Sequence, residues 1–157
     1  MKSPFLIAAL LLLGGPPASS SSSSAALFDY LSAIDLPLSA EHTVRIGGKS
    51  SELRAVVLDN EQPLYTRSRA LAAYAQIADF QSLDWLTVVA HAPLPRPLRR
   101  QAVISIAEIY GPIAPAQVSV ILIELMPSMP WNNADLLKRL RVLSVTERAK
   151  TLLTDSE

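Results

Sequence analysis

The sequence predicts an all-α domain built from repeated helical pairs. Residues 63–77, PLYTRSRALAAYAQI, are similar to residues 95–109, PRPLRRQAVISIAEI, and the prolines Pro63, Pro95 and Pro127 follow one another at intervals of 32 residues. Within both stretches the apolar residues recur at the spacing of one helix face. Self-similarity at a fixed interval of this length indicates structural units that stack on one another.

The N-terminal segment has the pattern of an export signal. Lys2 precedes an apolar run of 9 residues at 5–13, and a Gly-Gly-Pro-Pro sequence at 14–17 then breaks any helix. This run is about half of the ~20 residues that a membrane-spanning helix needs, so we expect no stable membrane insertion. A buried N-terminal helix is the alternative interpretation.

Small residues follow the apolar run, and cleavage after Ala18 and cleavage after Ala26 both fit the pattern. The serine tract at 19–24 is a low-complexity segment for which we expect disorder. Residues 1–26 are thus predicted to be a signal peptide with a Ser-rich segment, and residues 27–157 a helical repeat domain. The expected location is outside the inner membrane, either periplasmic or secreted.

The stretch before the repeats is open to two interpretations. Residues 26–34 have the pattern of a short amphipathic helix. Residues 41–58 could form a hairpin across Gly47 and Gly48, or a loop over residues 39–50 could lead into a helix capped by Ser50 or Ser51. We prefer the loop, because Val56 and Val57 of the following helix stand in the repeat register.

Two series of helices alternate in the repeats. The first series comprises helices near residues 63–78 and 95–110, each with apolar residues at i, i+3, i+4 and i+7. These positions are Leu71, Tyr74, Ala75 and Ala78 in one helix and Val103, Ile106, Ala107 and Tyr110 in the next. Alanines 75 and 107 are expected to allow close approach of neighbouring helices.

The second series is predicted at residues 82–92 and 115–126, after turns at 79–81 and at Gly111 and Pro112. We expect the prolines at 63, 95 and 127 to separate one helical pair from the next. The arginines at 67, 69, 99 and 100 are expected in first turns or on the solvated side of the helices.

The repeats resemble HEAT repeats, especially the short HEAT-like repeats of bacterial proteins. The resemblance rests on a proline, an arginine four residues later, and alanine and isoleucine at helical spacing, from Pro63 to Ile77 and again from Pro95 to Ile109. It covers residues 51–126 well and 127–154 loosely. It implies an α-solenoid of about three to four repeats, and the charged residues at 138, 139 and 141 fit a polar C-terminal cap.

The composition argues against several kinds of chemistry. The chain has 14 Lys and Arg against 14 Asp and Glu, so no overall positive field favours nucleic acid. It has no cysteine, which excludes disulfides, thiolate metal sites and a lipid anchor on cysteine. His42 and His91 lack metal-site spacing, and no glycine-rich phosphate loop occurs. We therefore expect no metal, no cofactor and no catalytic residues.

The resemblance implies a binding surface on the second helices, which line the concave side of HEAT arrays. Its residues here would be Trp85, Thr87, Gln117 and Ser119. Trp85 could equally pack against its neighbours, as tryptophans at helical spacing commonly do. A HEAT-like lyase or base-excision enzyme is the rival interpretation, and it would need a pocket around Asp84 or Glu52.

Arg96, Arg99 and Arg100 form a basic cluster beside Pro95. They could bind an acidic partner, or they could donate to carbonyl groups at the end of a neighbouring helix. We expect a non-catalytic protein-binding or scaffolding module of the cell envelope, with a protein partner whose identity the sequence leaves open. A purely structural protein that self-associates is a further alternative, because the oligomeric state is also open.

Overall fold

The computed structural model describes the backbone of residues 20–77 and 82–154 and the side chains of residues 24–77 and 82–145. The described residues form eight α-helices, and no strand occurs among them, so the predicted all-α class is confirmed. In chain order the helices are α1 (Ser20–Ser32), α2 (Ala40–Arg45), α3 (Ser50–Leu58), α4 (Leu64–Ile77), α5 (Ser82–His91), α6 (Arg96–Ser105), α7 (Pro115–Leu125) and α8 (Asn133–Thr154).

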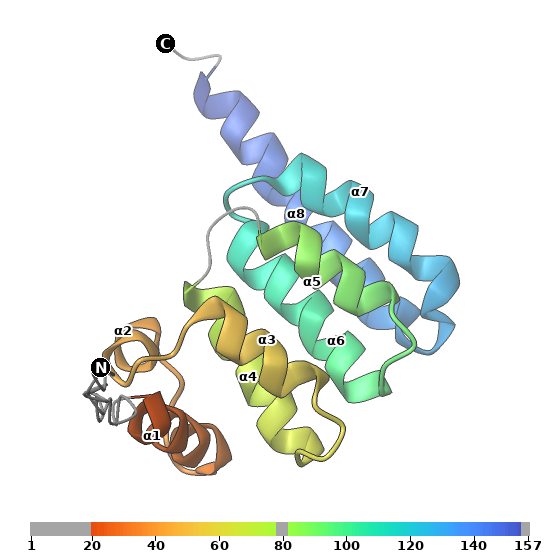
Figure 1. The fold of residues 1–157 in the computed structure, drawn as a ribbon. Coiled ribbons are helices and arrows are strands. Elements are labelled where there is room, and N and C mark those ends of the chain that lie inside the picture. Colours follow the sequence, from red (N-terminus) through yellow and green to blue (C-terminus); the bar gives the residue numbers. More distant parts are fainter. Residues whose placement is uncertain (1–19, 78–81, 155–157) are drawn as a thin grey trace, which may run out of the picture.

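The helices from α3 onward pack as consecutive pairs in two layers (Figure 1). Helix α3 packs on α4, α5 on α6 and α7 on α8, while α4 also packs on α6 and α5 on α7. Pro63, Pro95 and Pro127 lie in the connections inside these pairs. The prediction that the prolines separate one pair from the next is therefore wrong, because the two helices on either side of each proline pack directly on one another. The turn expected at residues 79–81 lies outside the described residues.

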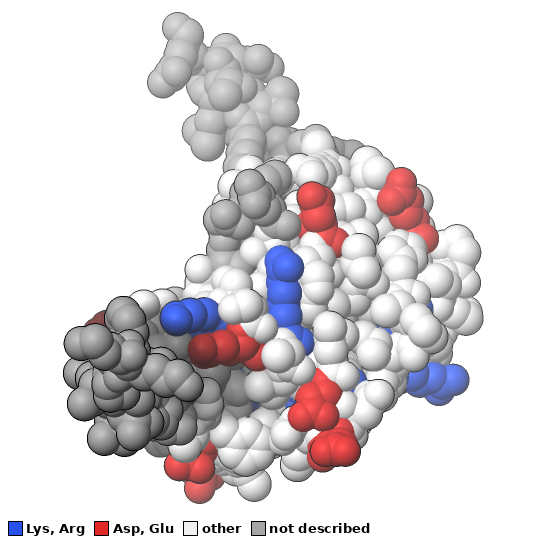
Figure 2. All heavy atoms as spheres, viewed as in Figure 1, with Lys and Arg blue, Asp and Glu red and all other residues white. Residues whose placement is uncertain are grey.

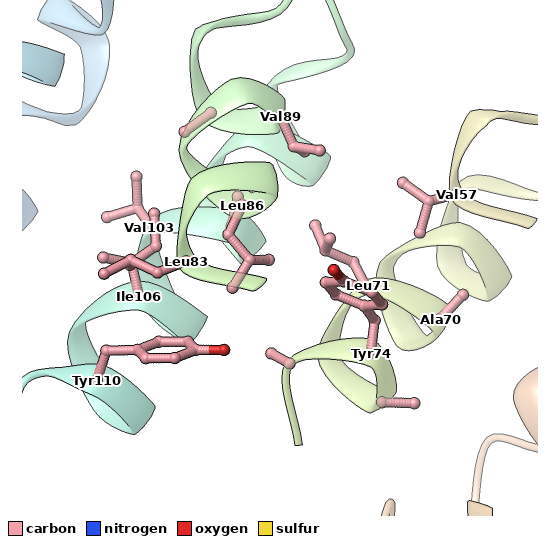
Figure 3. Packing of buried hydrophobic residues seen from close by; sticks show 14 of the residues in the cluster. Val57, Ala70, Leu71, Tyr74, Leu83, Leu86, Val89, Val103, Ile106 and Tyr110 are labelled. Atoms are coloured by element: carbon pink, nitrogen blue, oxygen red, sulfur yellow. The ribbon is translucent and has the colours of Figure 1, made fainter. Parts of the chain in front are cut away.

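Buried side chains from both layers form one continuous core. Figure 3 shows Leu71 and Tyr74 of α4 pointing toward Leu86 of α5, while Leu83 on the other side of α5 lies beside Ile106. All five are less than 2% exposed. Burying a leucine or isoleucine side chain contributes about 1.5–3 kcal/mol, so this contact between consecutive pairs supplies much of the stability. Buried alanines on the adjacent helices α4 and α6 are Ala70, Ala73, Ala75 and Ala102.

Two arginines at equivalent repeat positions are built into the fold. Arg67 is only 4% exposed, and its Nε donates to the carbonyl oxygen of Val57 at 2.9 Å. One repeat later, Arg99 Nε donates to the carbonyl oxygen of Ala90 at 2.8 Å. Val57 and Ala90 lie in the last turns of α3 and α5, where unpaired carbonyls attract cations. Arg67 and Arg99 lie in the first turns of α4 and α6, as expected, and Arg67 is buried there. The alternative of bonding to a neighbouring helix end is confirmed for Arg99.

Helix α1 is anchored through its C-terminal half. Leu27, Tyr30 and Leu31 are buried, and the Tyr30 hydroxyl donates to the carbonyl oxygen of Pro37 at 2.8 Å. The amphipathic helix expected at 26–34 is the end of α1. The helix begins at Ser20, so residues 20–24 of the serine tract are helical and not disordered as expected. Residues 1–19, where most of the predicted signal peptide falls, lie outside the described part of the chain.

Helix α2 occupies the region for which a loop or a hairpin was expected. Ser39 caps it, because its Oγ accepts a hydrogen bond from the His42 backbone nitrogen at 3.1 Å. Gly47 has φ = 85° and turns the chain after the helix. A Cβ on Gly48 would lie 2.7 Å from Thr43 Cγ2, so only glycine fits this approach. The hairpin is therefore wrong, and the expected loop is limited to residues 46–49. Neither expectation included α2, because six residues are too few for apolar periodicity to reveal a helix.

The following helix α3 starts at Ser50 as expected, but its cap differs. Lys49 holds the capping position, and no side chain there bonds to the helix backbone. Val57 is buried in the predicted repeat register, whereas Val56 is partly buried.

A π-helical turn, Ile106–Tyr110, continues α6 and ends at the predicted turn of Gly111 and Pro112. It contacts α4, α5 and α7. A Cβ on Gly111 would collide with the carbonyl oxygen of Ala107 and lie 2.6 Å from Leu143 Cδ2 of α8. Two short 3-10 turns, Met126–Ser128 and Pro130–Asn132, then connect α7 to α8.

Candidate functional site

The outward side of α5 and α7 presents aliphatic side chains to solvent. Leu83, Leu86 and Val89 of α5 face the core, as do Val118, Leu122 and Leu125 of α7. The residues between them at helical spacing must therefore point outward. We call this surface the α5–α7 face, and its exposed residues are Asp84, Val88, His91, Ala116, Gln117, Val120, Ile123 and Glu124.

The α5–α7 face combines apolar exposure with low charge. Val88 is 62% exposed, Val120 55% and Ile123 56%. Figure 2 shows this side of the molecule as mainly uncharged, with isolated acidic and basic side chains. Exposed aliphatic residues gathered on adjacent helices are typical of surfaces that bind other proteins.

The predicted binding residues on these helices have different environments. Gln117 is exposed, and Ser119 is half-buried. Thr87 is half-buried as well, and its Oγ1 donates to the Leu83 carbonyl oxygen at 2.8 Å within the same helix. Gln117 and Ser119 thus lie on or beside the α5–α7 face, and Thr87 has one hydrogen bond already made.

Trp85 packs against two neighbouring helices. Its ring lies edge-on to Tyr74 of α4, with ring centroids 4.5 Å apart, and Arg54 of α3 lies 5.0 Å from the Trp85 ring centroid. Arg54 also donates from Nε to the Tyr74 hydroxyl at 3.0 Å, which satisfies this fully buried phenol. The geometry supports the packing interpretation of Trp85, and a role in binding stays a prediction.

The two acidic residues of the rival interpretation lie on different helices. Asp84 is exposed on α5, and Glu52 is half-buried on α3 with one carboxylate oxygen that has no partner among the described residues. Neither residue lines any of the three hollows described below.

The basic cluster surrounds a second tryptophan that the sequence analysis did not select. The guanidinium carbon of Arg96 lies 5.6 Å from the Trp131 ring centroid, and that of Arg99 lies 5.9 Å from it. Trp131 stands in the 32-residue register of Arg67 and Arg99, so its register position was the available signal. The register position of Trp131 does not predict its contact with α6. That contact depends on how the 3-10 turn packs in the folded chain.

Two hollows meet at Arg100 and Trp131. The larger hollow has a volume of about 420 Å³ and is lined by Ser68, Arg96, Pro97, Arg100, Gln101, Ile104 and Trp131. The smaller hollow, of about 290 Å³, is lined by Arg100, Trp131, Asn132, Ala134 and Asp135. We call the two together the Trp131 groove.

A third hollow of about 400 Å³ lies between the π-helical turn and α8. Arg139 crosses it, with Nη1 3.3 Å from Glu108 and Nε 3.0 Å from Asp135. Lys138 and Arg141 of the same basic run are exposed. Arg139 is thus committed to an internal ion-pair network, whereas its two basic neighbours face solvent.

Asp59 lies in the connection between α3 and α4, and its carboxylate accepts two local hydrogen bonds. The side chain of Gln62 donates to its Oδ2 at 3.0 Å, and the backbone nitrogen of Glu61 donates to its Oδ1 at 2.9 Å. These two hydrogen bonds, the first more strongly, lower the pKa of Asp59 below its usual value.

The described part of the chain contains neither a metal-binding cluster nor a membrane-spanning helix. Its residues include no group of three or more histidine, aspartate or glutamate side chains placed to hold a metal ion. None of its helices is long and apolar enough to span a bilayer.

Comparison with known proteins finds no matching protein-family model, no matching curated protein and no matching solved structure.

Proposed function

We propose that this chain is a non-catalytic protein-binding module, built as a HEAT-like α-solenoid, that presents the α5–α7 face to a partner protein. The observation that carries the proposal is the exposure of Val88, Val120 and Ile123 on adjacent helices held rigidly by a common core. Stacked helical pairs suit such a role because the core fixes the position of every outward side chain. Gln117 and Ser119 would add polar contacts at the same surface.

The proposed location is the cell envelope, reached through an N-terminal export signal. The sequence pattern of residues 1–17 supports this proposal. N-terminal sequencing of the protein from cell fractions is the test. A mature N-terminus at Ser19 or Leu27 in the exported fraction agrees with the proposal, and an intact N-terminus in the cytoplasm contradicts it.

Site-specific photo-crosslinking tests the α5–α7 face. A photoreactive amino acid is placed at Val120, and the matched control carries it at Val44 of α2, which is 61% exposed on another part of the molecule. The crosslinked partner is identified and purified, and its affinity is then measured with the unmodified protein and with Val120→Glu. We expect the charge to weaken binding at least about tenfold, because a buried unpaired charge costs more than 1.4 kcal/mol. An unchanged affinity would refute the role of this face.

Self-association through the same face is the alternative structural role. Sedimentation of the purified protein over a range of concentrations distinguishes the two. A monomer agrees with a binding module, and a concentration-dependent assembly that Val120→Glu dissolves favours the structural role.

A further inference from the structure

The Trp131 groove contains positive charge that no carboxylate of the described residues neutralises. Arg99 is occupied, since its Nε donates to Ala90 and its Nη2 donates to the Ser128 carbonyl oxygen at 2.8 Å. Arg96 and Arg100 are exposed, and no carboxylate of the described residues lies within ion-pair distance of either. Two guanidinium groups therefore remain available at the groove for an anionic ligand.

A buried amide marks the other end of the groove. Asn132 lines the smaller hollow and is only 6% exposed, yet its side-chain nitrogen has no acceptor among the described residues. A buried donor without an acceptor is costly and uncommon in folded proteins. Asp135, the acidic residue in this hollow, accepts from Arg139 Nε at 3.0 Å and so has a partner already.

Apart from Ser68 and Gln101, the remaining lining of the groove is apolar. Pro97 and Ile104 line the larger hollow, and the Trp131 ring is shared by both hollows. An occupant that spans the two hollows thus meets both cations and an apolar surface. A free anion such as phosphate would use only the cations.

We propose that the Trp131 groove binds an acidic peptide segment of a partner protein. Carboxylates of the segment pair with Arg96 and Arg100, and an aliphatic side chain packs on Trp131. Nucleic acid fits less well, because the chain carries equal numbers of acidic and basic residues and thus no net positive charge. The inference rests on the proposed function in one respect, that the partner is a protein.

Fluorescence of Trp131 provides the test. In a Trp85→Phe background Trp131 is the one remaining tryptophan, because the chain contains two. The probe is an acetylated, amidated eight-residue peptide of alternating glutamate and leucine. Its controls are the same peptide with glutamine in place of glutamate, a twelve-nucleotide oligothymidine and inorganic phosphate.

We expect the acidic peptide to bind saturably and to shift Trp131 emission. Arg96→Gln with Arg100→Gln should weaken binding at least about fivefold, as should glutamine in the peptide. Arg141→Gln, which also removes an exposed charge but lies outside the groove, should leave the affinity unchanged. Circular dichroism confirms that each variant is folded.

Three results would overturn the inference: equal binding of the glutamine peptide, an equal loss with Arg141→Gln, or no binding of the acidic peptide. Competition by oligothymidine or phosphate at similar concentrations, with the same dependence on Arg96 and Arg100, would also overturn it and indicate a general anion site. Val120→Glu separates this inference from the proposed function. If Val120→Glu abolishes binding of the crosslinked partner but leaves peptide binding intact, both proposals are supported. If Val120→Glu changes neither, the role of the α5–α7 face is refuted and the Trp131 groove is not.

Discussion

Replacement of Arg99 by methionine should destabilise the protein more than the same change at the more deeply buried Arg67. Arg99 donates to Ala90 and Ser128 at 2.8 Å each and stacks on Trp131, so three segments lose a common partner. A hydrogen bond to a charged group contributes about 1.5–3 kcal/mol, and partial exposure reduces this, which gives about 2–4 kcal/mol for Arg99→Met.

At Arg67 the cost of burying the charged side chain offsets more of what its hydrogen bonding contributes. It makes one hydrogen bond, to Val57 at 2.9 Å, and its Nη2 is buried without an acceptor among the described residues. Methionine fills similar volume and relieves the cost of burying a charge, so Arg67→Met should cost about 1 kcal/mol or less. Arg100→Met, at an exposed position, serves as the control and should change stability by less than about 0.5 kcal/mol.

Urea unfolding followed by circular dichroism measures all three free energies of unfolding. The reasoning is refuted if Arg67→Met costs as much as Arg99→Met. It is also refuted if Arg99→Met is indistinguishable from Arg100→Met, because the hydrogen bonds to two carbonyls would then contribute nothing to stability.

Further predictions concern the buried core, the pKa of Asp59 and the close packing around Gly111. Leu86→Ala should lower the free energy of unfolding by about 2–5 kcal/mol, and Val88→Ala, on the exposed side of the same helix, by less than about 0.5 kcal/mol, as measured in urea. In a carbon-13 NMR titration Asp59 should titrate below its usual pKa, and Gln62→Ala should move its pKa upward; an unchanged pKa would contradict the assigned hydrogen bond. Because the pKa is lower in the folded state, the stabilisation by Asp59 is present above its unfolded pKa and lost as pH falls through the lowered value. Gly111→Ala should lower the thermal midpoint, since the added methyl group meets a carbonyl oxygen one turn earlier and a leucine of α8, at a cost of about 1–3 kcal/mol; a midpoint equal to that of the native chain would show that α8 moves away freely.

Periodicity in the sequence located the repeat helices closely. The predicted helices at 82–92 and 115–126 correspond to Ser82–His91 and Pro115–Leu125. Each has a strong apolar stripe and a helix-breaking residue near its ends, so local patterns suffice. Helix α2 was missed because six residues hold too little pattern to distinguish a helix from a loop.

Contacts between distant residues could not be predicted in the same way. The repeat register equates Arg67 with Arg99 but does not reveal which carbonyl each will reach. The pairing of helices across Pro63 and Pro95 was also not predictable. An internal helix has one neighbour before it and one after it in the sequence, and the sequence pattern does not show which of the two it packs on. The Trp131 groove could be predicted only in part. Arg96 was selected from the sequence for its charge, whereas the position of Trp131 beside it depends on tertiary packing.

The π-helical turn at Ile106–Tyr110 gives the end of the α6 rod a wider backbone than the part before it. In a π-helix the hydrogen bonds join residues five apart, so one turn holds more residues than the 3.6 of an α-helix. This one turn contacts α4, α5 and α7, and Gly111 directly after it lies against Leu143 of α8. Helices from three consecutive pairs thus meet at a single turn of the chain.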